Sequence, residues 1–309
     1  MKLATRLNSI LPEVKGDILE ALELVSKIDG ITSVDLNYPE HFKDVSIEEI
    51  KSKLSSTGLE LNGIALRFRN GFINGDLGNT DPSILESAMK LSKDAADVCS
   101  TLGGKIITIW LGHDGFDYSF QLNYEKVWTQ VKEKIQELAD YNKEVDFSIE
   151  YKPYEERAYA LIDSIGSTLL IVNDINRENV GVTVDYCHML MKKENPAFSL
   201  SLANMRNKLL GVHINDGYGF QDNGLMIGAS SFFQTVEFIY YLKKYKPNTT
   251  VYFDTFPLRE NTTNEIEQNV EMFNLISNKI DILGMDKIDN TINANDGISA
   301  HKLMIEFLK

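Results

Sequence analysis

The sequence is poor in cysteine, in histidine and in positive charge. Its 309 residues include two cysteines, Cys99 and Cys187, too few for the disulfide framework of a small secreted domain. Lysine and arginine number 31 against 45 aspartates and glutamates, so the formal charge is -14 at pH 7. Because this charge repels nucleic acid overall, and because the chain has only five histidines, a nucleic-acid partner is not expected.

Long apolar runs are missing as well. No run reaches the ~18 residues that a membrane-spanning helix needs. Residues 1–8 also lack the apolar core and small-residue cleavage site of a signal peptide. We therefore expect a cytoplasmic protein without a membrane partner. The hydrophobic share of 43% is ordinary for a globular protein with a large core.

What the sequence does contain is a regular alternation of strand and helix patterns. Eight apolar segments are typical of strands: 3–8, 31–37, 59–68, 105–111, 146–151, 181–185, 209–215 and 250–254. Helices are predicted between them, including one at 155–165 beside a short apolar segment at 168–172. Eight strand–helix units predict an α/β fold, the closed (β/α)8 TIM barrel. We expect one barrel domain over 1–286, and a C-terminal extension over 287–309 that packs on the barrel or on a neighbouring subunit.

Four of the predicted strands end in a side chain that can bind a metal ion. In chain order these residues are Glu150, Asp185, His213 and Asp254. The carboxyl ends of barrel strands form one mouth, where active sites lie, and neighbouring strands are ~5 Å apart. A single acidic strand end is more often a helix cap, but four in succession predict a metal site. Three carboxylates and one imidazole favour Mn²⁺, Co²⁺ or Mg²⁺, with Zn²⁺ also suitable.

Other polar residues are predicted at the same mouth. His188 and Asp222 can approach a second cation, so one or two ions per subunit are expected. Lys152 lies two residues after Glu150 and shares its face of the strand, where it can polarise a carbonyl oxygen or carry a proton. Asp216 is either a further ligand or an acceptor that orients the strand-end histidine.

Aromatic and basic residues near strand ends are predicted to bind the substrate: Trp110, Phe68, Phe72, Arg67 and Arg6. The aromatic side chains either form an apolar wall against the carbon face of a sugar or fill the top layer of the barrel. The arginines, with Arg69 beside them, either bind an anionic group such as a phosphate or sulfonate on C6, or pair with the many acids of the protein.

The order and spacing of these motifs resemble those of a known family. The chain is similar to the xylose isomerase-like TIM barrels and, among them, to the L-rhamnose isomerase-like proteins. The matching segments are Ile109-Trp-Leu111, Glu150-Tyr-Lys-Pro153, Val184-Asp-Tyr-Cys-His188, His213-Ile-Asn-Asp216, Asp222-Asn-Gly-Leu-Met-Ile-Gly228 and Phe253-Asp-Thr-Phe-Pro257. The family pattern has a further aspartate two residues past Asp222, where this chain has Gly224.

The resemblance implies a metal-dependent enzyme that acts on monosaccharides and assembles as a homodimer or homotetramer. Under it, Glu150, Asp185, His213 and Asp254 hold the first metal, His188 and Asp222 hold the second, and the catalytic residues are Glu150, Lys152, His188 and Asp222. Related ketose 3-epimerases use a glutamate at the last strand, where this chain has a shorter aspartate. That difference favours aldose–ketose isomerisation, a 1,2 hydrogen shift on an opened sugar, with 6-deoxy and 6-anionic sugars among the candidates.

Other functions stay open at this stage. A ketose 3-epimerase or an inosose-type dehydratase would use the same barrel and ligands. An endonuclease IV-like phosphodiesterase also has a metal site in a barrel of this kind, but it would need more histidines and a basic DNA-binding face. A metal-binding sensor without turnover is the remaining alternative. The products formed from a panel of sugars would distinguish among them.

Overall fold

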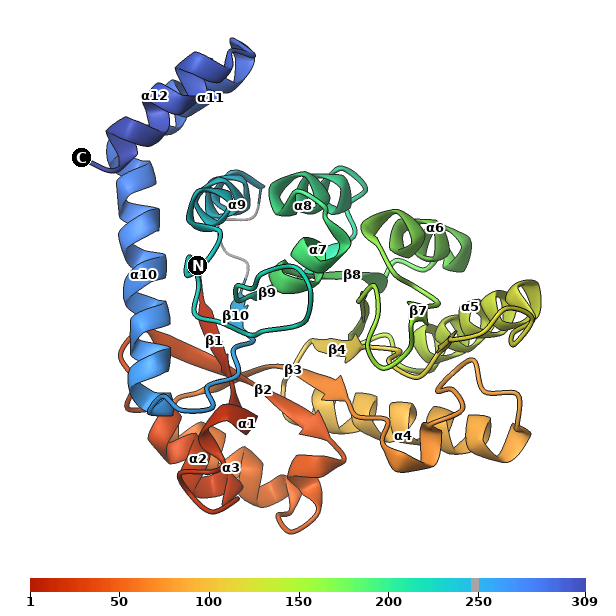
Figure 1. Cartoon of the computed structure of the whole chain (residues 1–309). Coiled ribbons are helices and arrows are strands. Elements are labelled where there is room, and N and C mark those ends of the chain that lie inside the picture. Colours follow the sequence, from red (N-terminus) through yellow and green to blue (C-terminus); the bar gives the residue numbers. More distant parts are fainter. Residues whose placement is uncertain (246–249) are drawn as a thin grey trace.

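The computed structural model describes residues 1–245 and 250–309. Eight parallel strands close into a barrel in the order β1-β10-β9-β8-β6-β4-β3-β2, and helices surround it (Figure 1). The strands are β1 (Leu3–Arg6), β2 (Ile31–Tyr38), β3 (Glu60–Leu66), β4 (Ile106–Ile109), β6 (Asp146–Glu150), β8 (Val180–Asp185), β9 (Leu209–Ile214) and β10 (Val251–Phe253). The predicted barrel is confirmed, and each predicted strand overlaps one of these.

The helices begin mostly where the sequence places caps. Around the barrel lie α1 (Leu7–Ile10), α2 (Ile18–Val25), α3 (Ile47–Thr57), α4 (Pro82–Thr101), α5 (Tyr124–Tyr141), α6 (Ile165–Ile175), α7 (Tyr186–Lys192), α8 (Pro196–Met205), α9 (Phe232–Tyr245) and α10 (Thr262–Leu283). Ser46 and Glu49 form the predicted capping box of α3, and Asp81 caps α4 ahead of Pro82. In the described ranges, no helix is both long and apolar enough to cross a membrane.

The inside of the barrel is polar beneath the mouth, whereas the core between strands and helices is apolar. A cavity of about 430 Å³ is lined by Ser33, Asp35, Asn62, Thr108, Thr183 and His213, together with charged residues at the amino ends of the strands. Gly211 keeps this lumen open, because a Cβ there would lie 2.2 Å from Thr183 Oγ1. The strand-end residues therefore sit above a cavity lined mainly by polar side chains.

The predicted helix at 155–165 is wrong. Residues 159–160 form β7 (Tyr159–Ala160), which pairs antiparallel with β5 (Gly115–Phe116) outside the barrel. The backbone N–H of Ala158 donates to Asp117 Oδ1 at 2.9 Å, so a distant loop takes the hydrogen bonds that a helix would have used. The apolar segment at 168–172 lies instead inside α6, which Ser164 and Ser167 cap.

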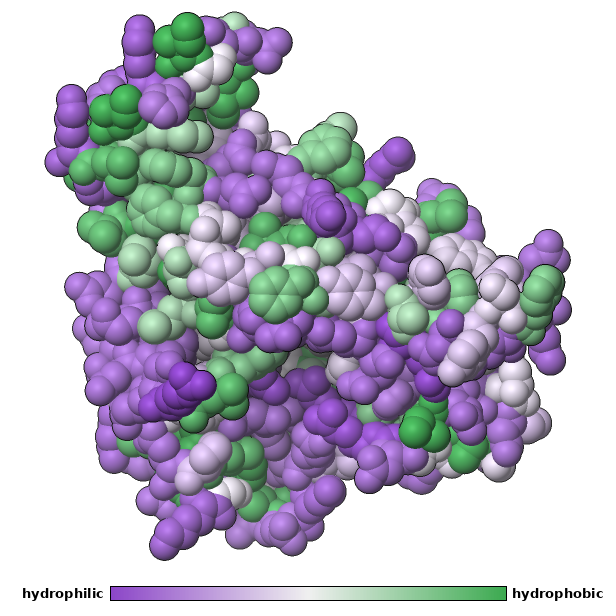
Figure 2. Space-filling model, viewed as in Figure 1, coloured by the Kyte–Doolittle hydropathy of each residue, from purple (hydrophilic) through white to green (hydrophobic). Residues whose placement is uncertain are grey.

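The C-terminal segment is helical, which the sequence patterns did not predict. Helices α11 (Met285–Asn293) and α12 (Gly297–Phe307) form a hairpin that projects from the end of α10 (Figure 1). The ring of Phe307 contacts Phe232 at 6.0 Å, and a cavity of about 220 Å³ lies between the hairpin and helices α9 and α10. Figure 2 shows apolar side chains gathered over this corner. The division at residue 286 and a contact with a neighbouring subunit stay predictions.

Candidate metal centre

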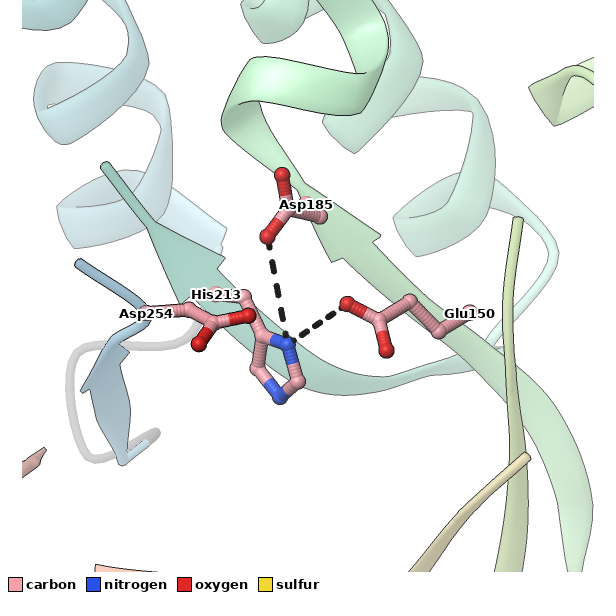
Figure 3. A group of neighbouring side chains, drawn as sticks. All are labelled: Glu150, Asp185, His213 and Asp254. Carbon is pink, nitrogen blue, oxygen red and sulfur yellow. Dashed lines mark hydrogen bonds and ion pairs between the residues drawn. The ribbon is translucent and has the colours of Figure 1, made fainter. Parts of the chain in front are cut away.

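The four strand-end residues meet at the mouth of the barrel. We call these residues, Glu150, Asp185, His213 and Asp254, the strand-end cluster. One ligand atom from each lies within 4.8 Å of all the others. The Nδ1 atom of His213 is 2.9 Å from Glu150 Oε1 and 4.0 Å from Asp185 Oδ2 (Figure 3). The first three residues are buried and Asp254 is nearly so.

The strand register places two of these residues directly side by side and Asp254 just beyond them. Asp185 pairs directly with His213 across β8 and β9, and His213 pairs with Tyr252 across β9 and β10. Asp254 follows Phe253, and its backbone N–H donates to Ile214 O at 3.2 Å. Because parallel strands with matched register end at the same height, their terminal side chains are delivered to one point.

Burial and charge set the protonation of the strand-end cluster. Burial alone would raise the pKa of Glu150, but the charge and hydrogen bond of His213 lower it to about 2. Burial lowers the pKa of His213, but the negative charges of Glu150 and Asp254 outweigh this effect and raise the pKa to about 9. Burial raises the pKa of Asp185 to about 7. His213 therefore holds a proton at neutral pH that a bound cation would displace.

The donor set fits a divalent cation. Asp254 Oδ1 and Asp222 Oδ1 are buried and have no hydrogen-bond partner among the described residues. Unpaired buried carboxylate oxygens are costly unless something positive binds them. Three carboxylates and one imidazole at mutual ligand spacing are a set that Mn²⁺, Co²⁺, Mg²⁺ or Zn²⁺ can accept. The identity of the metal stays a prediction.

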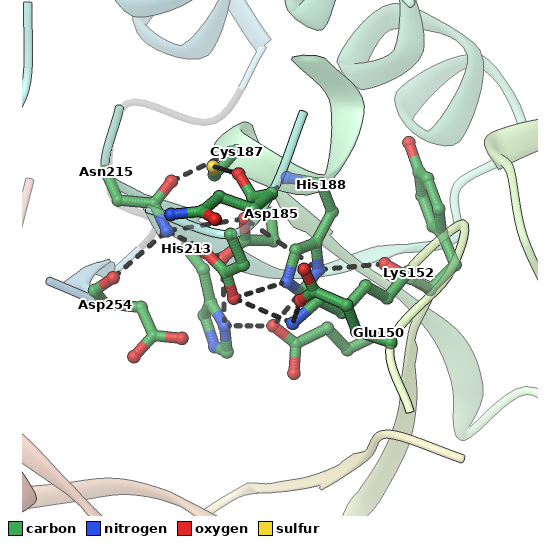
Figure 4. A network of polar contacts seen from close by, with 12 residues as sticks. Glu150, Lys152, Asp185, Cys187, His188, His213, Asn215 and Asp254 are labelled. Carbon is green, nitrogen blue, oxygen red and sulfur yellow. Dashed lines mark hydrogen bonds and ion pairs between the residues drawn. The ribbon is translucent and has the colours of Figure 1, made fainter. Parts of the chain in front are cut away.

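Asn215 is part of the centre, although the sequence reasoning did not single it out. Its Nδ2 lies 3.3 Å from Asp185 Oδ2 and 3.0 Å from the backbone oxygen of Asp254, while its Oδ1 accepts from Cys187 N at 2.8 Å (Figure 4). It therefore ties two members of the strand-end cluster together. The signal was its position two residues after His213, on the same face of the chain.

A second group of polar residues lies beside the strand-end cluster. Lys152 Nζ is 3.0 Å from Asp222 Oδ2 and 2.8 Å from Glu155 Oε2, and it stands 5.1 Å from the centre of the Trp110 ring. Asp222 Oδ2 is also 3.2 Å from His188 Nε2. Burial lowers the pKa of Lys152, but Asp222 and Glu155 raise it well above its usual value. Lys152 is therefore a fixed cation at neutral pH.

The contacts of His188 define its charge state. Its Nδ1 is 2.9 Å from the backbone oxygen of Tyr151, and its Nε2 faces Asp222. Both partners can only accept hydrogen bonds, so both ring nitrogens donate and the ring is an imidazolium. Consistently, although burial lowers the pKa of His188, Asp185 and Asp222 raise it to about 9.

The second predicted metal site stays a prediction. His188 and Asp222 do contact each other, but among the described residues the group spaced to hold a metal is the strand-end cluster alone. Asp216 does not orient His213. Its carboxylate accepts from the backbone N–H groups of Ser230 and Ser231 at 2.8 and 3.0 Å, and it fixes the loop that leads into α9.

The predicted substrate-binding residues lie around the rest of the mouth, and Trp110 and Arg6 border the charged residues just described. Phe68, Arg67 and Trp110 surround one small cavity of about 20 Å³, and Phe72 packs edge-on against Phe68 at 5.2 Å. Arg6 Nε lies 3.6 Å from Asp254 Oδ1, and its guanidinium stacks over Phe256 at 4.4 Å. These residues reach the mouth, but their binding role stays a prediction.

Asp35 was also missed by the sequence reasoning. It is buried on the lumen face of β2, where Oδ1 accepts from Asn62 Nδ2 at 2.8 Å. Burial raises the pKa of Asp35 to about 6, against the charge of His213. An acidic residue in the middle of an apolar strand pattern was the available signal, and it marks the polar lumen beneath the strand-end cluster.

Comparison with known proteins identifies the family. A family model described as xylose isomerase-like TIM barrel matches residues 22–275. The chain belongs to this family. The match covers all of the strand-end cluster and leaves out Arg6 and helices α11 and α12. The finer resemblance to L-rhamnose isomerase-like proteins stays a prediction.

Curated relatives of this xylose isomerase-like chain are similar over part of their length. The xylose isomerase of Thermus thermophilus is 25% identical over 185 residues, which cover 58% of this chain and 48% of the relative. The xylose isomerase of Thermus caldophilus is 27% identical over 180 residues, which cover 56% and 46%. The chain thus spans about half the length of the curated relatives that it matches.

Solved structures show the same fold. The D-psicose 3-epimerase of Clostridium cellulolyticum H10 superposes with a TM-score of 0.74 at 18% identity, covering 90% of this chain and 99% of that one. The 3-keto-D-glucoside 4-epimerase of E. coli gives 0.68 at 17%, covering 89% and 99%. The IOLI protein, whose structure holds a zinc atom, gives 0.68 at 19%, covering 90% and 99%. At these identities the likeness establishes the fold alone.

Proposed function

We propose that this protein is a divalent-metal-dependent aldose–ketose isomerase of monosaccharides. The observation that carries the proposal is the charged Lys152, held by Asp222 beside the strand-end cluster and under the face of Trp110. A buried, fixed ammonium stabilises negative charge that develops on a carbonyl oxygen, which is what a shift of hydrogen between C1 and C2 demands. Family membership and the similarity to xylose isomerases support the same reaction class.

The ion would be held by Glu150, Asp185, His213 and Asp254. When bound, a divalent ion supplies Lewis-acid stabilisation of the sugar oxygens. Asn215 keeps Asp185 in place and anchors the backbone at Asp254. The zinc atom in the structure of a protein with the same fold supports a divalent ion here.

The remaining residues of the centre provide charge, protons and shape. In the forward direction the hydrogen on C2 moves to C1, while the proton on O2 leaves and O1 gains one. Lys152 binds the carbonyl oxygen and offsets its charge. His188 gives its Nε2 proton to O1, and the neutral ring then takes up the proton that leaves O2. Asp222 orients both side chains through the same oxygen. Trp110 gives the sugar an apolar wall and keeps water from the reacting carbons.

The test is product identity with and without metal. The protein is stripped with a chelator, reloaded with Mn²⁺, Co²⁺, Mg²⁺ or Zn²⁺, and incubated with aldoses and ketoses that include 6-deoxy and 6-anionic sugars. Products are assigned by NMR. We expect interconversion of one aldose–ketose pair that stops on stripping. Turnover that persists without metal would contradict the proposal. So would the absence of turnover for every combination of sugar and metal.

A matched pair of variants tests the role of Lys152. Lys152→Met should lower kcat by about 100-fold or more, because it removes charge stabilisation made only in the transition state. Its metal content should stay at the wild-type level. Lys90→Met is the control, since Lys90 is an exposed residue of α4 paired with Asp94. Full activity of Lys152→Met would remove the basis of the mechanism.

A ketose 3-epimerase is the second candidate. It is favoured by the two carboxylates of Glu150 and Asp254, which lie on either side of His213 and could take and return a proton at one carbon. The similarity to solved 3-epimerases agrees with it. In the product panel, a C3 epimer formed without any aldose would establish this candidate in place of the isomerase.

A further inference from the structure

The mouth of the barrel divides into two halves with opposite hydrogen-bonding needs. On the side of β6 to β10, the buried unpaired atoms at the strand ends are acceptors, Asp222 Oδ1 and Asp254 Oδ1. On the side of β1 to β3, three of these atoms are donors, namely Arg6 Nε, Asn37 Nδ2 and Arg67 Nε; the Thr5 hydroxyl and Asp76 Oδ1 also lack a hydrogen bond there within the described ranges. The acceptors suit a cation. Of the donors, Arg6 Nε has an ion-pair partner in Asp254 Oδ1 at 3.6 Å, whereas Asn37 Nδ2 and Arg67 Nε have none in the described part of the chain, so a ligand that satisfies them must bring acceptors of its own.

The three donors stand side by side on neighbouring strands. Arg6 ends β1, Asn37 lies near the end of β2, and Arg67 directly follows β3, with β2 paired to both of the other strands. Asp35, two residues before Asn37, faces the lumen cavity, so the alternation of the strand points Asn37 inward as well. Because all three are at the carboxyl ends of their strands, they open onto the mouth that holds the strand-end cluster.

The two buried arginines on this side differ, because Arg6 lies 3.6 Å from Asp254 Oδ1 whereas Arg67 has no carboxylate partner among the described residues. Within residues 1–245 and 250–309, no hydrogen bond or ion pair involves the guanidinium of Arg67. Burial, and then the charge of Arg6, lower the pKa of Arg67, which shows that the two guanidinium groups repel each other. Arg69 differs, because it is exposed and pairs with Glu40 at 2.7 Å. Two neighbouring guanidinium groups, one of them unpaired, are a setting for an anion.

Two nearby carboxyl groups do not fill this role. Asp76 lines the same small cavity as Arg67, but burial and the neighbouring Asp114 raise its pKa to about 8, so it is uncharged at neutral pH. Asp254 is 3.6 Å from Arg6, but it belongs to the strand-end cluster and would be engaged by a bound ion. Binding of the ion would therefore leave Arg6 less neutralised than before.

We infer that Arg6, Asn37 and Arg67 bind an anionic group of the substrate, a carboxylate, phosphate or sulfonate, at the end away from the reacting carbons. The inference rests on the proposed function, because it takes the reacting carbons to lie at the strand-end cluster. An extended sugar can then reach across the mouth, with its carbonyl end near Lys152 and its charged end between the two arginines. Guanidinium groups match the paired oxygens of such anions, and the Asn37 amide adds a donor.

Calorimetric titration with polyols that cannot react is the test. Sorbitol, sorbitol 6-phosphate and gluconate are titrated into Mn²⁺-loaded protein. At least one of the two anions should bind about tenfold or more tightly than sorbitol, and the anion preferred distinguishes a phosphate from a carboxylate site. The comparison uses wild-type protein alone, so it does not depend on a variant that folds.

Two variants assign the preference to the arginines. Arg67→Gln should bring the affinities for the anions and for sorbitol to within about twofold of each other. Arg177→Gln removes one positive charge near the amino end of β8, where Arg177 pairs with Asp140 at 2.8 Å, and it should keep the preference. Equal binding of all three polyols by the wild type, including no measurable binding of either anion, overturns the inference. A preference that survives in Arg67→Gln also overturns it, because the ion or another cation is then responsible.

Failure of the anion site and failure of the isomerase would give different results. Turnover of neutral sugars without any anion preference would overturn the inference and leave the isomerase standing. An anion preference that is lost in Arg67→Gln, in a protein that turns over no sugar, would support the anion site and reject the isomerase.

Discussion

At the scale of single residues, two histidines govern how the centre responds to pH. In the metal-free protein, neighbouring carboxylates outweigh burial and raise the pKa of His188 and of His213 to about 9, against 6.5 for a free imidazole. The stability contributed by a raised histidine pKa is full below about 6.5 and is lost as the pH rises through about 9. Asp185 acts in the same direction at lower pH, because burial raises its pKa from 3.8 to about 7 and stability falls as the pH rises between these values.

We therefore expect the metal-free protein to lose thermal stability between pH 6.5 and 9. Metal affinity should rise over the same interval, because His213 must release its proton to become a ligand. Both trends can be measured by thermal melts of chelated and Mn²⁺-loaded protein at a series of pH values.

The His188→Asn variant is the control for this pH dependence. Its metal-free form should show a flatter loss of stability, since one of the two raised histidines is gone. A melting temperature that stays constant or rises from pH 6.5 to 9 in the metal-free wild type would contradict the assigned charge states. An unchanged slope in His188→Asn would exclude His188 as a source of the trend.

At the scale of elements, the strands were predictable and the loops between them were not. The strand ends carried their own signal, because polar side chains such as Glu150 and His213 follow apolar runs. The contacts of Lys152 with Asp222 were not predictable, since they join positions 70 residues apart through a loop of no fixed period. The segment 155–165 was predicted as a helix, but hydrogen bonds from the distant loop at Asp117 hold it in another conformation.

The hairpin of α11 and α12 is an element whose role can be tested by removal. Ile288 and Phe307 are its buried apolar side chains, and Phe307 packs on Phe232 of α9. A chain that stops at Gly284 should keep the barrel and its metal binding, because no residue of the strand-end cluster contacts the hairpin. It should melt at a lower temperature, because apolar surface of α9 and α10 becomes exposed.

Circular dichroism and metal titration of the shortened chain measure these effects. Light scattering of the full and shortened chains tests the predicted contact with a neighbouring subunit, since a mass that falls by a whole-number factor would assign assembly to the hairpin. Loss of cooperative melting together with loss of metal binding would show instead that the hairpin is part of the barrel domain.

At the scale of the whole molecule, closure of the barrel is what creates the centre. Glu150 and Asp254 are far apart in the sequence, and only a closed ring of parallel strands brings them to opposite sides of His213. The same closure sets the donors on β1, β2 and β3 across from the carboxylates on the other strands. A protein with a net charge of -14 thus presents a mouth whose carboxylates suit a cation in one half and whose unpaired donors suit an anion in the other.

We expect the mouth of the barrel to hold a divalent ion between the four strand-end residues. Anomalous diffraction at the manganese edge, from crystals grown with Mn²⁺, tests it most directly. We predict one peak per chain, at roughly 2.0–2.6 Å from ligand atoms of Glu150, Asp185, His213 and Asp254. No peak at that position, or a peak only between His188 and Asp222, would contradict the account.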